Sequence, residues 1–259
     1  MSVISAPRLR LPDQVNIDFG PAEILGPAFL QLDRAARERG IYLSISRDFG
    51  ELAEVNRNNR EDWYPLVPMF DSSIGGVSSE NGFWIYGVND RGAIVATQAA
   101  RLYLWPDTTF VQEWENRTFI YEDPARQSQP DERCTANCPG AYNITGRVCH
   151  TGALWMHPDY RNTGIGSLLP RVTRAYALTT WYPDYMFGIA KIRPSLSAQS
   201  VKRLYGWQHY DRELNWYGSP HLGDITEIAV CWMNEQEVLA DVGKFSAAQT
   251  QIRSEKLAA

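Results

Sequence analysis

The sequence predicts a single α/β domain built on a mixed β-sheet. A β-hairpin comes first, because two β-rich runs in "GFWIYGVNDRGAIVATQAARLYLW", residues 82–105, are joined by the turn-forming residues 89–92. Strand-like and helical runs then alternate toward the end of the chain. A hairpin followed by strand, helix, strand, helix and strand is typical of helices packed on a mixed sheet.

The segment before the hairpin is expected to be mainly helical. In residues 22–40 apolar side chains recur at helical spacing, and a glycine ends the run. A short strand is expected at 41–46, followed by one or two helices over 48–67, which Pro65 interrupts. We assign residues 1–40 to an N-terminal helical extension of the domain.

The second half of the chain contains the alternating elements. Strands are expected at 146–156, 185–192 and 224–233, with helices starting near 164 and 195. Residues from about 105 to 146 are irregular and rich in Pro, Asn, Gln and Asp, which predicts either a functional insertion or a mobile flap. We expect this segment to shape the acceptor pocket. The domain therefore spans residues 41–235, and residues 236–259 form a C-terminal tail.

Composition and charge narrow the function classes. Hydrophobic residues make up 44% of the chain and charged residues 21%, and the net charge is −5 without a basic block. This balance argues against a nucleic-acid-binding protein. The start lacks a signal-peptide core, and no window approaches eighteen consecutive apolar residues. We expect a cytoplasmic protein with no membrane partner.

The cysteines raise the question of a metal site. Cys134, Cys138, Cys149 and His150 can be drawn as a zinc site. Adjacent strand residues point to opposite faces, however, so the last two could not share one metal. We expect reduced thiols and no metal, and leave open whether Cys134 pairs with Cys138.

A glycine-bearing turn is the strongest functional signal. In "RNTGIGSLLPRVTRAYAL", residues 161–178, Gly164 and Gly166 begin an amphipathic helix. The first N–H groups of a helix have no intrahelical acceptor, and together with the helix dipole they favour a phosphate. The segment lacks the Gly-Lys-Ser/Thr of a Walker loop and the complete Rossmann pattern. A plain strand-to-helix turn is the alternative.

These residues resemble the GNAT family of acyl-CoA-dependent N-acetyltransferases. The family signature is Arg/Gln-x-x-Gly-x-Gly/Ala, which Arg161, Gly164 and Gly166 match, and "MHPDY" supplies Pro158 and Tyr160 before it. The resemblance covers roughly residues 40–235. It implies a single GNAT-like domain whose mixed central sheet has a splayed fourth and fifth strand pair flanked by helices.

The resemblance also implies how a donor binds. Acetyl-CoA would be the acyl donor, with loop amides around its pyrophosphate and the preceding strand beside its pantetheine arm. The implied cofactor-binding residues are Leu154, Trp155, Met156, Arg161, Asn162, Thr163, Gly164, Ile165, Gly166, Ser167 and Ser195. We expect the side chains of Trp155 and Met156 themselves to pack in the core, and His157 to cap the turn.

Two residues are catalytic candidates. In the histone-acetylating branch of the family, a glutamate eleven residues before the signature acts as base, and His150 stands at that position. A histidine titrates near pH 6.5 without help. A histidine satisfied within the sheet is the alternative. A second family pattern, Asn-x-x-Ala-x-x-Leu-Tyr-x-x-x-Gly-Phe, leaves Tyr205 or Lys202 at the tyrosine, and Tyr205 is our candidate general acid.

The predicted function is an acyl-CoA-dependent N-acyltransferase, moving an acetyl group to an amine of a small molecule or protein. A non-catalytic acyl-CoA-binding module is the alternative, and a binding protein without coenzyme A is a third reading. The acceptor is not specified by the sequence, and a homodimer is an open expectation.

Overall fold

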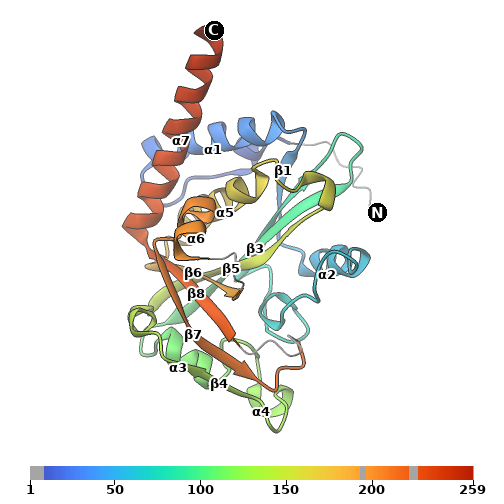
Figure 1. Ribbon diagram of the computed structural model, residues 1–259, viewed down its shortest axis with the longest axis vertical. Helices are drawn as coiled ribbons and strands as arrows, with labels where there is room; N and C mark the ends of the chain where they lie inside the picture. Colours follow the sequence, from blue (N-terminus) through green and yellow to red (C-terminus); the bar gives the residue numbers. More distant parts are fainter. Residues whose placement is uncertain (1–8, 193–196, 222–226, 259) are drawn as a thin grey trace.

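One eight-stranded β-sheet runs through the protein in the order β1-β2-β3-β5-β6-β8-β7-β4 (Figure 1). The computed structural model describes residues 9–192, 197–221 and 227–258. The strands are β1 (Tyr42–Ser46), β2 (Gly82–Val88), β3 (Ile94–Trp105), β4 (Arg133–Ala136), β5 (Gly146–Met156), β6 (Tyr185–Lys191), β7 (His209–Tyr217) and β8 (Glu227–Asn234). All neighbouring strands are antiparallel except β5 and β6, so the sheet is mixed, as predicted.

Helices cover both faces of this sheet. They are α1 (Ala22–Arg37), α2 (Phe49–Asn58), α3 (Phe110–Glu115), α4 (Pro124–Gln127), α5 (Ile165–Trp181), α6 (Ala198–Tyr205) and α7 (Glu235–Ala258), with short 3-10 turns η1 (Leu11–Gln14), η2 (Pro68–Phe70), η3 (Pro139–Asn143) and η4 (Pro158–Tyr160). Within the described ranges, none of these helices is both long and apolar enough to cross a membrane.

The predicted hairpin is confirmed as β2 and β3. The side chain of Asn89 accepts hydrogen bonds from the N–H groups of Arg91 and Ala93, both at 3.0 Å. Gly92 adopts φ +79°, which a side chain would disfavour. The turn therefore forms because its asparagine and glycine satisfy the backbone locally.

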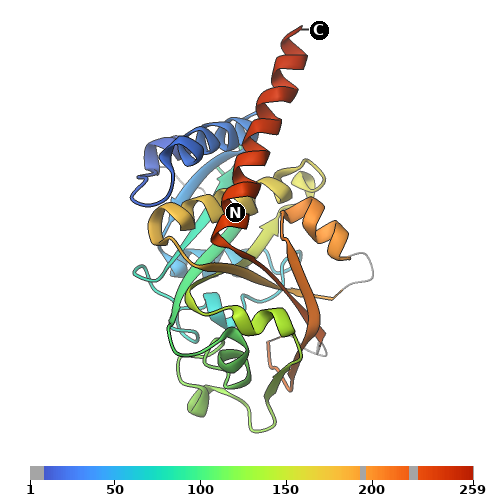
Figure 2. The ribbon, with the colours of Figure 1, turned by 90° about the vertical axis from the view of Figure 1, so that its left-hand side faces the viewer.

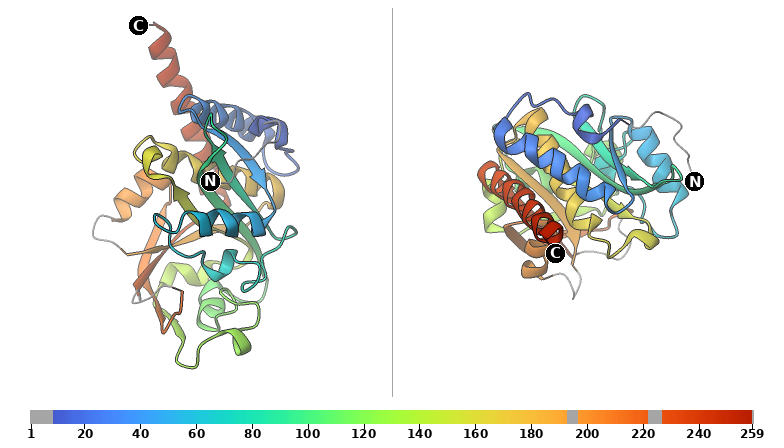
Figure 3. Two further views of the ribbon diagram at one scale, coloured as in Figure 1. Left: turned by 90° about the vertical axis from the view of Figure 1, so that its right-hand side faces the viewer. Right: turned by 90° about the horizontal axis from the view of Figure 1, so that it is seen from above.

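The two faces of the sheet have separate hydrophobic cores. Buried side chains of α1, α5, α6 and α7 pack on one face, and those of α2, η2 and α3 pack on the other. Figure 2 and Figure 3 show the same division, with α1 and α7 side by side above the sheet. The segments expected as an N-terminal extension and a C-terminal tail thus both contribute to the core, and α7 continues beyond the body of the protein (Figure 1).

The segment 105–146 differs from the irregular insertion that the sequence predicts. It contains α3, α4, β4 and η3, and β4 pairs with β7 at the edge of the sheet. The buried carboxylate of Glu132 accepts hydrogen bonds from Tyr121 at 2.8 Å and from Trp216 of β7 at 2.6 Å. Elements of four to six residues are too short to show periodicity, so tertiary contacts rather than local pattern define them.

Candidate active site

The parallel strands β5 and β6 separate at the centre of the sheet. They pair over only three positions, ending at His150 and Phe187, although both strands continue further. Ala153 has φ +50°, and it and Leu154 together oppose the single residue Gln98 on β3. This β-bulge bends β5 away from β6. The splayed pair is fourth and fifth in sheet order, as the family resemblance implies.

A cavity of about 430 Å³ lies at the splay and passes from one face of the sheet to the other. Residues 151–154 of β5 and 188–191 of β6 form its sides. On the α5–α6 face it is lined by Val201, Tyr205 and Trp207, and on the opposite face by Trp63, Leu66 and Phe70. Its volume is in the range of small-molecule sites. The geometry allows two reactants to approach from opposite faces.

His150 lies at the point where the strands part. Its ring stacks between Phe70 and Phe187, with centroid distances of 4.9 and 4.8 Å, and contacts the edge-on ring of Phe119. The side chain is 1% exposed and lines the cavity. Neither ring nitrogen has a hydrogen-bond partner among the described residues. An imidazole with both nitrogens unpartnered can bind a reacting group.

The aromatic surroundings keep His150 neutral. Burial first, and then the positive charge of Arg101, its partner on β3, lower the pKa of the imidazole to about 3. The expected value near 6.5 therefore does not describe the folded protein. A neutral ring can still accept a hydrogen bond through one nitrogen and donate one through the other.

This shift predicts acid instability. Between about pH 3 and 6.5 the unfolded chain binds a proton at His150 that the folded protein does not, so the free energy of unfolding falls as the pH drops below 6.5. The slope is about 1.4 kcal/mol per pH unit. We expect the wild type to lose about 2 kcal/mol more than His150→Phe between pH 7 and 5, measured by urea denaturation. Equal losses in the two proteins would contradict the buried neutral state.

Tyr205 shares the cavity with His150. It is the last residue of α6, and Gly206 follows it with φ +81° as a left-handed cap. Its carbonyl oxygen accepts a hydrogen bond of 2.6 Å from the buried Arg174. Lys202, the other candidate at this position, is exposed and does not line the cavity. Ser195, predicted to contact the cofactor, lies outside the described residues.

The glycine-bearing loop presents a row of backbone donors. Asn162 has φ +62° and Gly164 has φ +87°, so the chain curls before α5 begins. The N–H groups of residues 162–166 donate to no other described residue, and residues 161–164 are exposed. Successive N–H groups in such a curl form an anion-binding concavity at the positive end of a helix.

Two arginines flank this loop. Arg39, which follows α1, donates through Nε to the carbonyl of Thr163 at 2.8 Å. Arg161 donates to the carbonyl of Met156 at 3.3 Å and forms an ion pair of 3.5 Å with Asp62. Sequence analysis missed Arg39, because 124 residues separate it from Thr163 and no local pattern connects them. The loop therefore lies beside two cations.

Flexible side chains lie close to both loop glycines, and the φ of +87° at Gly164 also disfavours a side chain. A Cβ on Gly166 would lie 2.8 Å from the terminal methyl group of Met156, and one on Gly164 would lie 3.3 Å from the Arg39 guanidinium. Larger residues at these positions would thus shift protein atoms as well as any bound phosphate. Substitution of the glycines cannot isolate ligand binding from loop shape.

The last two side chains of β5, Trp155 and Met156, pack inward as predicted. Trp155 is 3% exposed and stacks on Trp63 at a centroid distance of 5.3 Å, while Met156 packs against Gly166. The N–H of His157 donates to Val95 on β3 at 2.8 Å. Because strand N–H groups alternate in direction, the N–H of Met156 points toward the splay.

The predicted role of residues 105–146 is not supported by the cavity. The face of the cavity opposite α5 and α6 is lined by residues from the segment 63–70, which includes η2, and by no described residue of 105–146. The insertion contributes Phe119 behind His150 and Phe110 behind Phe187. Deleting the end of this insertion, residues 126–134, would also remove the buried Glu132. Such a deletion would therefore destabilise the fold whether or not the segment contacts a substrate.

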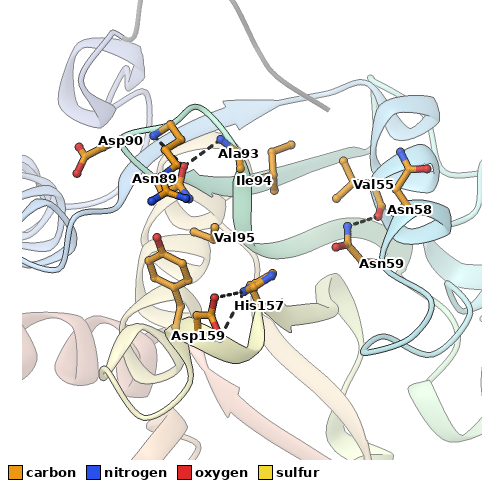
Figure 4. Close-up of a pocket in the computed structure, with 12 residues that line it drawn as sticks. Val55, Asn58, Asn59, Asn89, Asp90, Ala93, Ile94, Val95, His157 and Asp159 are labelled. Carbon is orange, nitrogen blue, oxygen red and sulfur yellow. Dashed lines mark hydrogen bonds and ion pairs between the residues drawn. The ribbon is translucent and has the colours of Figure 1, made fainter. Parts of the chain in front are cut away.

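A larger cavity of about 730 Å³ lies apart from the splay, between the end of α2, the β2–β3 turn and η4 (Figure 4). In Figure 4, His157 and Asp159 point toward each other, and the Nδ1 atom of His157 accepts from the N–H of Asp159 at 3.3 Å. His157 therefore caps the η4 turn, as predicted. This hollow shares no described lining residue with the cavity between β5 and β6, and we take the latter as the candidate site.

The four cysteines are buried free thiols. Burial raises the pKa of Cys138 to about 11 and that of Cys231 to about 12, so these thiols stay protonated at neutral pH. In the part of the chain that the structure describes, no group of three or more His, Cys, Asp or Glu side chains could hold a metal ion.

No protein-family model matches the chain, and no curated protein matches it. Several solved structures are similar to it. NAA60 of Arabidopsis thaliana in complex with acetyl-CoA is 12% identical, with 75% of this chain and 98% of that chain covered and a TM-score of 0.44.

Two further similar structures come from bacteria. A mutant of the spermidine N-acetyltransferase SpeG of Vibrio cholerae is 9% identical, with 77% and 96% covered and a TM-score of 0.43. The GNAT superfamily phosphinothricin acetyltransferase Pat of Sinorhizobium meliloti, in complex with AcCoA, is 12% identical, with 74% and 88% covered and a TM-score of 0.39. These similarities concern the fold.

Proposed function

We propose that the protein is an acyl-CoA-dependent N-acyltransferase that moves an acetyl group from acetyl-CoA to an amine. The observation that carries this proposal is the cavity between β5 and β6, with a loop of five N–H groups that make no described hydrogen bond just beyond the end of β5. A pyrophosphate joined to a long flexible thioester arm fits this combination of an anion cradle and a passage through the sheet.

The donor would lie along β5. The N–H groups of residues 162–166 would bind the pyrophosphate, and Arg39 and Arg161 would add positive charge beside it. The pantetheine arm would extend beside Leu154 and Met156, where the N–H of Met156 faces the splay without a strand partner. The thioester would then reach His150. Ser195 remains a predicted contact.

In the transfer, a C–N bond would form and the C–S bond would break at the thioester carbon. The amine nitrogen attacks the carbonyl carbon, and strand N–H groups stabilise the negative oxygen that forms. His150 accepts the proton that the nitrogen loses, and Tyr205 supplies a proton to the sulfur as the C–S bond breaks. The products are the amide and the free thiol of coenzyme A.

Binding and turnover test this function separately. Calorimetry is expected to show acetyl-CoA binding, and a thiol-reactive dye is expected to show release of coenzyme A when an amine is added. The neutral state of His150 is the observation that favours the alternative, a non-catalytic acyl-CoA-binding module. Binding without thiol release for any amine would establish that alternative, and absence of binding would exclude both.

A further inference from the structure

The half of the cavity opposite α5 and α6 has an aromatic and apolar wall. Trp63, Tyr64, Leu66 and Phe70 form it, and Trp63 is held in place by its stack on Trp155. Among the described residues that line the cavity, none is an Asp or a Glu. An ammonium group entering from this face would find no carboxylate to pair with.

Two positively charged side chains, Lys191 in the described lining and Arg101 behind Phe70, lie at this half of the cavity. Arg101 is 8% exposed and is absent from the ion pairs among the described residues; its guanidinium donates to the carbonyl of Met69 at 3.3 Å and lies 4.5 Å from the ring centroid of Tyr103. Lys191 is the charged side chain in the described lining. The neighbouring Asp62 is paired with Arg161. This field opposes the entry of a second positive charge.

Among the described residues that line the cavity, none is a base strong enough for an alkylammonium ion. An aliphatic amine is protonated at neutral pH and must lose a proton before it can attack. His150 has a pKa of about 3 in the folded protein, so it would take that proton only at a high free-energy cost. An amine attached to an aromatic ring is already neutral at pH 7, because its lone pair is delocalised into the ring.

We propose that the acceptor is an arylamine, a neutral amine carried on a flat aromatic ring that binds against Trp63 and Phe70. This inference rests on the proposed function and names its substrate class. Aromatic pairs add about 0.5–1.5 kcal/mol beyond the burial of area, and the wall offers such faces at the position where a body attached to the nucleophile would lie.

A base as weak as His150 is sufficient for the proton transfer in this reaction. When the arylamine nitrogen attacks the thioester carbon, it becomes positively charged and strongly acidic, so a weak base can accept its proton. The C–N bond forms, the C–S bond breaks, and the proton passes to the sulfur. An arylamine and acetyl-CoA thus give an N-aryl acetamide and the free thiol, with no other reactant.

A matched pair of acceptors tests the class. With acetyl-CoA at pH 7, we expect kcat/KM for aniline to exceed that for cyclohexylamine, of similar size, at least 100-fold, with spermidine inactive. Raising the pH toward 9.5 should lower the ratio of the two kcat/KM values, because the neutral fraction of cyclohexylamine increases. Preference for cyclohexylamine or spermidine would overturn the inference and leave the proposed function intact. Donor binding without transfer to any of the three would overturn the inference and support the non-catalytic module.

A substitution that adds a negative charge tests whether the absence of a carboxylate from the wall causes the preference for an arylamine. Leu66→Glu places a carboxylate in the aromatic wall, and Leu66→Gln is the uncharged control of the same size. We expect the ratio of kcat/KM for aniline to that for cyclohexylamine to be at least tenfold lower in Leu66→Glu than in Leu66→Gln. Equal ratios in two folded variants would show that the missing carboxylate does not set the preference.

Discussion

Ser167→Asp is expected to weaken acetyl-CoA binding roughly 10- to 10³-fold while the fold remains intact. Ser167 is the third residue of α5, beside the exposed amides of the glycine-bearing loop. A carboxylate there would repel a bound pyrophosphate by about 1–4 kcal/mol at 4 Å, depending on the local dielectric. In the free protein the same carboxylate would stabilise the start of the helix by about 0.3–1 kcal/mol.

The control for this change is Ser167→Asn, which has nearly the same shape and no charge. Both variants lose the hydrogen bond of 2.9 Å that the hydroxyl donates to the carbonyl of Gly164, so their difference isolates the charge. Calorimetry at low and at physiological salt measures the effect, which salt should reduce. Equal affinities for the Asp and Asn variants would place the pyrophosphate elsewhere.

The elements around the loop could be predicted because their signals are local. The bounds of β5 agree with the predicted strand 146–156, and α5 begins at Ile165, next to the expected position. A β-rich run that begins at Gly146 and is followed by Pro158, with an amphipathic helix after it, needs only neighbouring residues to be recognised. The strand β7 was missed, because its alternation includes charged residues, and it is placed by pairing with β4 and β8.

The walls of the site could not be predicted, because distant segments supply them. Arg39 reaches the loop from the end of α1, and Trp63, Leu66 and Phe70 reach the cavity from a connection between α2 and β2. No pattern within the motif strand indicates these partners. The bulge at Ala153 is also invisible in sequence, since alanine rarely adopts a positive φ and only the register with β3 requires it.

The protonation state of His150 could not be predicted from the sequence either. Residue type alone predicts a pKa near 6.5. The three rings that bury the imidazole come from η2, from the connection after α3 and from β6, and they meet only in the folded protein. Their packing decides whether this histidine can act as a conventional base, and sequence position does not.

His150→Phe is expected to lower kcat roughly 10²- to 10⁴-fold, the usual effect of losing general acid–base catalysis, with acetyl-CoA affinity unchanged. A phenyl ring would fill the space between Phe70 and Phe187 without leaving a cavity, which His150→Ala would create. The variant therefore removes the ring nitrogens and keeps the packing. Near-wild-type turnover in a folded His150→Phe protein would exclude His150 as the proton acceptor.

The pH profile gives an independent reading of the same residue. With an acceptor that is neutral across the range, wild-type kcat should be flat from about pH 5 to 8, because His150 stays neutral throughout when its pKa is about 3. An inflection near pH 6.5 that disappears in His150→Phe would mean that ligand binding opens the aromatic stack and restores the ordinary pKa. A flat profile together with the loss of turnover would instead show that a buried, weakly basic imidazole is sufficient, because the nitrogen it deprotonates becomes acidic only after the C–N bond has formed.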